Sequence, residues 1–134
     1  RELLLLDPDD HQGQRFVLLR LLMSFDRDDE AASLIERYPD DMADTLYTSA
    51  LLNFRRHGRG DRADRALKKA LRNNRHVSTY LLGQVPLPSI EPMPFSPGDE
   101  MEAINYASAF LNAWRRTPKA RDWLREFVHR RRNT

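Results

Sequence analysis

The sequence predicts a single all-α domain in which antiparallel helix pairs stack side by side. Apolar residues recur at spacings of three and four through most of the chain, which is the period of an amphipathic helix. The motif Pro8-Asp9-Asp10 returns 31 residues later as Pro39-Asp40-Asp41, and repetition at this scale is typical of stacked supersecondary units. Of the 134 residues 40% are hydrophobic, so a chain the size of one domain can bury a core.

The first half of the chain is expected to form three helices. Asp9 or Asp10 can accept hydrogen bonds from the free amides of a first turn, so a helix should begin there. Residues 14–25 are apolar nearly all round, which predicts a helix covered by neighbours on more than one side. A second helix is expected over about 28–38. Pro39-Asp40-Asp41 should end it and begin a third, over about 42–56, with Leu46, Tyr47, Ala50, Leu51 and Phe54 buried.

The second half is expected to add four helices, making about seven in one domain spanning 1–134. Glycines at 58 and 60 predict a turn before a fourth helix over 61–74, and a short apolar helix over 77–82 should follow. A long helix is expected over 99–116. Thr117 and Pro118 fit the N-cap and first position of a last helix that ends near residue 130.

Residues 84–97 contain five prolines, so no helix runs through them. Large apolar residues are interleaved with these prolines, and a solvated linker has no use for them. We therefore expect an ordered proline-rich strap that lies over the helices. The apolar residues expected to face the helices are Val85, Leu87, Ile90, Met93 and Phe95.

Several classes of protein are excluded or disfavoured by composition. The chain has no cysteine, which excludes a disulfide framework, a zinc–thiolate site and a cysteine nucleophile, and we expect a cytoplasmic location. No run approaches the ~20 apolar residues of a membrane-spanning helix, so no membrane span is expected in this chain. The first residue is Arg1, and Arg1 to Leu6 reads as the tail of a helix, so we expect a fragment of a longer protein.

Charge is distributed unevenly along the chain. Residues 1–54 carry 12 acidic and 5 basic residues, whereas residues 55–76 carry 9 basic and 2 acidic ones. We expect the basic stretch 55–76 to neutralise the acidic half in space. The alternative is that it binds nucleic acid or another polyanion through one side of the fourth helix. The residues of this candidate basic patch are Arg62, Arg65, Lys68, Lys69 and Arg72.

One spacing resembles the tetratricopeptide repeat. In that family a small residue lies five positions after the glycine between the two helices of a pair, and another lies seven further on. Gly58, Ala63 and Ala70 follow this ladder, and Ala31 precedes Ala63 by 32 residues, against a family repeat of about 34. Tyr38 departs from it, standing where the first unit would have its later alanine. The resemblance implies helix pairs stacked into a tetratricopeptide-like superhelix.

Residues of roughly 65–124 also resemble the C-terminal soluble part of the suppressor of tumorigenicity seven family. The segments that carry it lie on either side of the proline-rich segment: Ala70-Leu71-Arg72-Asn73-Asn74-Arg75-His76-Val77-Ser78-Thr79-Tyr80-Leu81-Leu82, Gly98-Asp99-Glu100-Met101-Glu102-Ala103-Ile104-Asn105-Tyr106-Ala107 and Ala113-Trp114-Arg115-Arg116. The resemblance implies tetratricopeptide-like helices without an established enzymatic activity. It assigns no catalytic residue to this chain.

No pattern of reactive or metal-binding side chains emerges, so we expect no catalytic residue, no metal and no cofactor. None of the four histidines lies three or four positions from another, as a helical metal site would need. The aspartates at 7–10 and 26–29 lack the alternation and the glycine of a calcium-binding loop, and helix capping explains them. Neither of the common glycine-rich phosphate-binding motifs is present.

The sequence therefore predicts a non-enzymatic protein–protein interaction or scaffold module. In a helical-repeat stack the first helix of each pair lines a concave groove, where arginines could pair with the carboxylates of an acidic protein or peptide. Nucleic acid is a less favoured partner, and self-association through the end of the stack or a purely supporting role stay open. The candidate groove residues are Phe16, Arg20, Thr45, Thr48, Leu52, Arg55 and Arg56.

Overall fold

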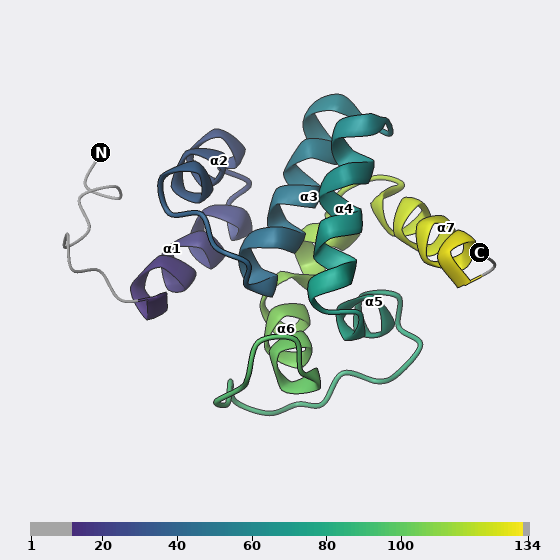
Figure 1. Cartoon of the computed structure of the whole chain (residues 1–134). Helices are drawn as coiled ribbons and strands as arrows, with labels where there is room; N and C mark the ends of the chain where they lie inside the picture. Colours follow the sequence, from purple (N-terminus) through teal and green to yellow (C-terminus); the bar gives the residue numbers. More distant parts are fainter. Residues whose placement is uncertain (1–11, 133–134) are drawn as a thin grey trace.

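The computed structural model describes residues 12–132, which form helices without any strand (Figure 1). The predicted all-α class is confirmed for this part of the chain, and the expected helix positions agree to within a few residues. The expected cap at Asp9 or Asp10 and the tail at Arg1 to Leu6 lie outside the described residues. The helices are α1 (Gln12–Ser24), α2 (Asp28–Arg37), α3 (Ala43–His57), α4 (Asp61–Asn73), α5 (His76–Leu81), α6 (Glu100–Arg116) and α7 (Ala120–Arg132).

Helices α3 and α4 form the most extensively packed pair, and Figure 1 shows them running side by side. Ala63 and Ala70 of α4 are fully buried, which lets the two helices approach closely. Gly58 ends α3 at a φ of 71°, a left-handed conformation that glycine adopts without a steric penalty. Helices α1 and α2 form a second packed pair. Packed helix pairs are thus a property of the fold.

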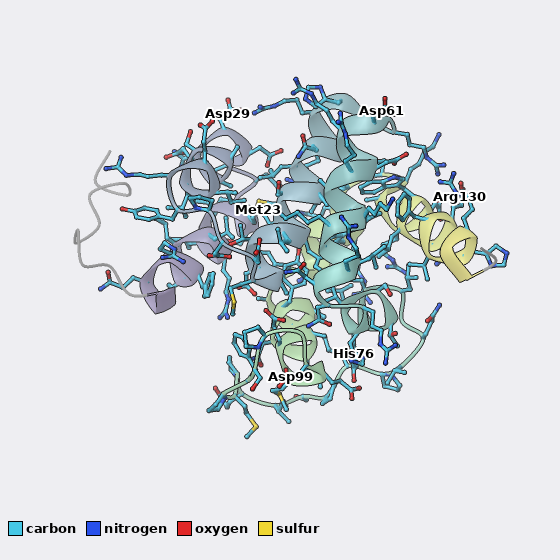
Figure 2. The ribbon with its side chains drawn as sticks, viewed as in Figure 1. Met23, Asp29, Asp61, His76, Asp99 and Arg130 are labelled. Carbon is cyan, nitrogen blue, oxygen red and sulfur yellow. The ribbon has the colours of Figure 1, made fainter. Side chains whose placement is uncertain are left out.

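Helix α6 lies at the centre of the molecule and contacts α1, α3, α5 and α7. Its inner face is almost wholly buried and includes Tyr106, Phe110 and Trp114. The rings of Tyr106 and Phe110 stack with their centroids 4.5 Å apart, and the indole of Trp114 donates to the Tyr106 hydroxyl over 3.0 Å. In Figure 2, Met23 lies well inside the molecule, whereas Asp61 lies at its edge. The core therefore forms around α6.

The start of α3 and the end of α4 are joined to α6 by one buried carboxylate. Glu102 accepts hydrogen bonds from the backbone N–H groups of Ala43 and Gly98 and from the side-chain amide of Asn74, each at 2.8 Å. Its own N–H donates to the side chain of Asp99, which caps the start of α6. The segments 70–82 and 98–107 thus meet at this network.

The end of α6 differs from the prediction. The Thr117 hydroxyl donates to the carbonyl of Ala113 at 2.8 Å, so it bonds back to α6 and does not cap the following helix. Helix α7 begins at Ala120, two residues after Pro118, so the expected N-cap and N-terminal proline are wrong. The reason is that Thr117 is buried against α6, which directs its hydroxyl away from α7.

Residues 84–97 form no helix, as the prolines require, and connect α5 to α6 in a wide loop (Figure 1). Met93 is tied to Asn105 by a reciprocal pair of hydrogen bonds of 2.8 and 3.3 Å. Of the five apolar side chains expected to cover the helices, only Leu87 is partly buried against the core. For the other four the expectation is wrong, because Asn105 fixes the segment through its backbone. These four exposed side chains are Val85, Ile90, Met93 and Phe95.

Candidate functional site

The face of α3 that the helical-repeat register assigns to a groove is covered by α6. Thr45, Thr48 and Leu52 are buried, and the Thr48 hydroxyl lies 3.3 Å from that of Tyr106 on α6. The expectation of an open groove is therefore wrong for Thr45 and Thr48, which lie in the interior. Leu52 is largely buried but lines, together with Arg56, a cleft of about 450 Å³ between α2 and α3. Phe16, on α1, is partly buried.

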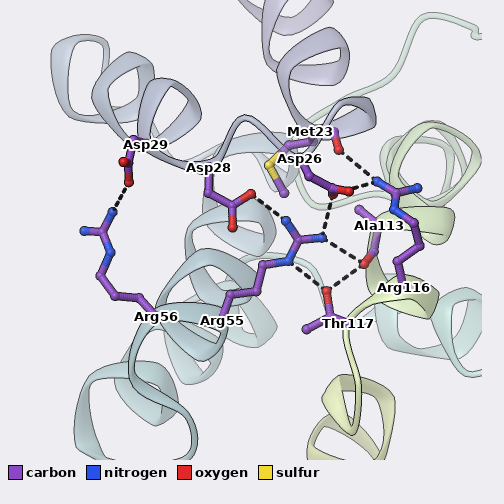
Figure 3. Close-up of polar contacts among 9 residues, drawn as sticks. All are labelled: Met23, Asp26, Asp28, Asp29, Arg55, Arg56, Ala113, Arg116 and Thr117. Carbon is purple, nitrogen blue, oxygen red and sulfur yellow. Dashed lines mark hydrogen bonds and ion pairs between the residues drawn. The ribbon is translucent and has the colours of Figure 1, made fainter.

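Arg55 lies inside a polar network that joins α2, α3 and the end of α6 (Figure 3). Its guanidinium donates to Asp28 at 2.6 Å, to the Thr117 hydroxyl at 2.8 Å and to the Ala113 carbonyl at 3.2 Å. A second pair, between Arg116 and Asp26 at 2.9 Å, adjoins it, and this hydrogen bond is the main reason that the pKa of Asp26 is lowered. Arg55 is thus occupied by intramolecular partners.

The expected neutralisation of the acidic half is confirmed for part of the basic stretch. Besides Arg55, Arg56 pairs with Asp29 at 2.9 Å, and Lys69 lies 3.7 Å from Asp41. The Arg56 pair lies at the surface, and Arg56 is the one residue of the predicted groove that is classed as exposed, with 54% of its side chain accessible. The seven groove residues therefore divide between the interior and the surface and do not form one site.

Replacing Arg55 with alanine is expected to lower the free energy of unfolding by about 2–4 kcal/mol. The substitution removes the one guanidinium that serves Asp26, Asp28, the Thr117 hydroxyl and the Ala113 carbonyl. The matched substitution Arg56→Ala removes an exposed pair and should change stability by no more than ~0.5 kcal/mol. Urea denaturation followed by circular dichroism measures both. Equal stabilities of the two variants would contradict a structural role for Arg55.

An exposed apolar stripe runs along α1. Val17, Leu21 and Phe25 follow one another at intervals of four residues and are 63%, 46% and 69% exposed. This spacing places Val17 and Leu21 on one face of the helix, and Phe25 follows directly after its last residue, with its N–H bonded to the Leu21 carbonyl at 3.2 Å. Helix α1 has neighbours on more than one side, as expected, since it contacts α2 and α6, but this face is left open. We call these three residues the α1 stripe.

A cleft of about 520 Å³ lies beside the α1 stripe, between α1 and α6. Val17 and Leu21 form one wall, Ala109 of α6 forms the other, and Pro92 closes one side. Its lining is mostly apolar, and Arg20 brings the only charged side chain among the described lining residues. We call it the α1–α6 cleft. Its remaining lining residues are Ser24, Asn105 and Ser108.

Two polar atoms near this cleft are buried without a hydrogen-bond partner among the described residues, namely Nε of Arg20 and Oδ2 of Asp44. The pKa of Asp44 is raised to about 6, mainly by burial. The positive charge of Arg20 opposes this shift, and the negative charges of Glu102 and Asp40 contribute to it. Arg20 thus stabilises the charged form of Asp44 without a hydrogen bond to it.

The raised pKa of Asp44 predicts a pH dependence of stability. Because the folded-state pKa of about 6 exceeds the ordinary value of 3.8, the folded protein binds the proton more tightly, and stability rises as the pH falls through 6. Between pH 7 and pH 5 Asp44 alone should add about 1 kcal/mol. Comparing urea midpoints of the wild type and Asp44→Asn at both pH values checks this. The same pH dependence in both proteins would be inconsistent with a protonatable, buried Asp44.

The candidate basic patch lies on the outer side of α4, and all five of its residues are exposed. Lys69 approaches Asp41, whereas within residues 12–132 no carboxylate pairs with Arg62, Arg65, Lys68 or Arg72. Arg62 contacts the His57 ring, and Arg65 donates to the Asp61 carbonyl. The patch is thus an accessible row of positive charge.

The stripe and the cleft were not singled out by sequence reasoning. Their signal was present in the four-residue spacing of Val17, Leu21 and Phe25, but the same spacing describes a buried helix face. Within the described range, no group of three histidine, aspartate or glutamate residues could hold a metal ion, and no helix has the length and apolarity needed to cross a bilayer. No protein-family model, no curated protein and no solved structure matches the chain.

Proposed function

We propose that this chain is a non-enzymatic protein-interaction module, and that its binding surface comprises the α1 stripe and the α1–α6 cleft. The observation that carries the proposal is where the exposed apolar side chains gather. Among residues 12–132 the exposed large hydrophobic side chains come only from the α1 stripe and from the segment 85–95. Pro92 of this segment also lines the α1–α6 cleft.

Physical chemistry favours a covering partner for such a surface. Burying apolar surface against a partner lowers the free energy by about 25 cal/mol for each Å² removed from water. Scattered exposed hydrophobic residues need no explanation, but an apolar stripe beside an apolar cleft is typical of an interaction site. A helix presenting residues at every fourth position is also a common recognition element.

A tetratricopeptide-like stacking of the helix pairs is part of the proposal. It is supported by the left-handed Gly58 between α3 and α4 and by the buried alanines at 63 and 70. In such a stack α6 would occupy the concave side, because it contacts α1, α3 and α5. The segment 84–97 would act as a strap anchored to α6 through Asn105. A cytoplasmic location belongs to the same proposal.

The test is a quantitative affinity purification from cells that make the protein, comparing the tagged wild-type chain with a Val17→Ser, Leu21→Ser variant. Both residues are exposed, so the fold should tolerate the change within ~0.5 kcal/mol. A matched control reverses charge on α4 with Lys68→Glu and Arg72→Glu. Thermal unfolding of all three proteins verifies that each is folded.

We expect the wild type and the α4 variant to recover at least one protein equally, and the α1 variant to recover about tenfold less of it. A tenfold difference corresponds to a loss of ~1.4 kcal/mol in binding free energy. Identical recovery by all three proteins would overturn the proposed surface.

A second candidate function is polyanion binding by the basic patch, favoured by the four cationic side chains that lack a carboxylate partner among the described residues. Such binding would weaken steeply as the salt concentration rises, because phosphate contacts release counterions. A gel-shift series with single-stranded RNA at two ionic strengths, using the wild type and the Lys68→Glu, Arg72→Glu variant, tests it. Absence of a salt-dependent shift would exclude this alternative.

A further inference from the structure

The chemistry of the α1–α6 cleft narrows the class of partner. Helix α1 has two basic residues, Arg15 and Arg20, and no acidic one. Arg15 pairs with Asp40 at 2.9 Å. Arg20 lines the cleft, and its Nε is buried without an acceptor among the described residues. The apolar cleft therefore has one positively charged group in its wall, and no described carboxylate forms an ion pair with it.

A carboxylate is the acceptor that best fits a guanidinium, because its two oxygens match N–H groups that lie side by side. Asp44 does not fill this role, since it acts on Arg20 only through its charge and leaves its own Oδ2 unpaired. The surroundings of the guanidinium in the cleft are apolar, which strengthens a charge-assisted hydrogen bond formed there.

We infer that the α1–α6 cleft binds a peptide segment of a partner protein in which an apolar side chain is followed closely by an aspartate or glutamate. The apolar side chain packs between Val17, Leu21 and Ala109, and the carboxylate pairs with Arg20. The inference rests on the proposed function and adds the chemistry of the ligand. The volume of about 520 Å³ lies within the range typical of small-ligand clefts, which suits one or two side chains of a peptide.

A second copy of the chain fits this surface less well. Two copies that met through their α1 stripes would form an isologous contact, in which each patch faces itself. Helix α1 has no acidic residue, so its arginine in the cleft would face a like charge and gain no acceptor. Charge complementarity thus favours an acidic peptide over self-association at this site.

The experiment selects peptides from a library of short random sequences displayed on phage, with the full-length chain immobilised. Affinities of the selected peptides are then measured by fluorescence anisotropy against the wild type, Arg20→Gln, Leu21→Ser and the control Lys68→Ser. Since Arg20→Gln could perturb the fold near Asp44, the selected peptide is also made with its carboxylate residue changed to the matching amide, which tests the same contact without altering the protein.

The expected result is a set of peptides that combine apolar and acidic residues. Their affinity should fall roughly 10- to 100-fold on Arg20→Gln and on the amide peptide, as expected for a charge-assisted hydrogen bond. The two changes together should cost no more than either alone, because each removes the same contact. Leu21→Ser should also weaken binding about tenfold, while Lys68→Ser should have no effect.

Other outcomes separate the inference from the proposed function. Peptides that depend on Leu21 but are indifferent to Arg20 and to their own acidic residues would overturn the inference and leave the interaction surface in place. Peptides whose binding is unaffected by Leu21→Ser would contradict both. Wild-type chain that dimerises in analytical ultracentrifugation, and becomes monomeric on Leu21→Ser, would assign the surface to a second copy and overturn the peptide inference.

Discussion

Replacing Glu102 with alanine is expected to lower the free energy of unfolding by about 3–5 kcal/mol. The carboxylate is buried and accepts three hydrogen bonds, from the N–H groups of Ala43 and Gly98 and from the Asn74 amide. Without it, three buried donors at the junction of α3, α4 and α6 have no acceptor, and each unpaired donor is unfavourable. Urea denaturation followed by circular dichroism gives the free-energy difference.

The neighbouring substitution Glu100→Ala serves as the matched control. Glu100 lies in the same first turn of α6 but is exposed, and its carboxylate accepts a hydrogen bond from the Tyr80 hydroxyl. Its removal should cost about 1 kcal/mol or less. If Glu102→Ala proved as mild as Glu100→Ala, the network at the start of α3 would not organise the fold as described.

Replacing Trp123 with alanine is expected to destabilise the protein by about 3–5 kcal/mol, the usual range for a buried tryptophan. The Trp123 ring stacks on Phe54 with centroids 4.6 Å apart, and its indole N–H donates to Asp64 at 2.9 Å. These contacts attach α7 to α3 and α4. Thermal and urea unfolding measured by circular dichroism check the loss.

Two further variants separate the contributions of Trp123. Trp123→Phe keeps an aromatic ring against Phe54 but removes the donor to Asp64, so it should cost about 1–2 kcal/mol. Phe127→Ala, on the same helix but only partly buried, should cost less than Trp123→Ala. A Trp123→Ala protein as stable as the wild type would mean that α7 does not pack on α3 and α4.

The helices and their turns could be predicted because their causes are local. Apolar periodicity fixed the helix ranges, prolines excluded a helix over 84–97, and Gly58 marked the turn where a left-handed residue is required. The hydrogen-bonding role of Thr117 was missed because it depends on burial against α6, which no local pattern shows.

Which element packs against each helix face could not be predicted, because this depends on contacts between residues far apart in the chain. Thr48 and Tyr106 are 58 positions apart in the sequence, yet their hydroxyls are in contact. This contact places inside the protein a face of α3 that a repeat register assigns to a groove. The reverse holds for Leu21 and Phe25, whose spacing indicates a buried face although they are 46% and 69% exposed. Periodicity identifies an apolar face but not its neighbour.

The absence of cysteine allows a direct measurement of which face is open. Three single-cysteine variants, Leu21→Cys, Thr48→Cys and Lys68→Cys, are reacted with a maleimide under native conditions, and the labelling rates are compared with those in denaturant. Leu21 lies on the α1 stripe, Thr48 lies beneath α6, and Lys68 is an exposed reference on α4. Circular dichroism verifies that each variant is folded.

Leu21→Cys should react about as fast as Lys68→Cys, and Thr48→Cys should react roughly 100-fold more slowly, because its thiol becomes accessible only through local unfolding. A peptide that binds the α1–α6 cleft should slow the labelling of Leu21→Cys alone. Fast labelling of a folded Thr48→Cys together with slow labelling of Leu21→Cys would contradict the account, because it would mean that the α3 face is open and the α1 stripe is covered.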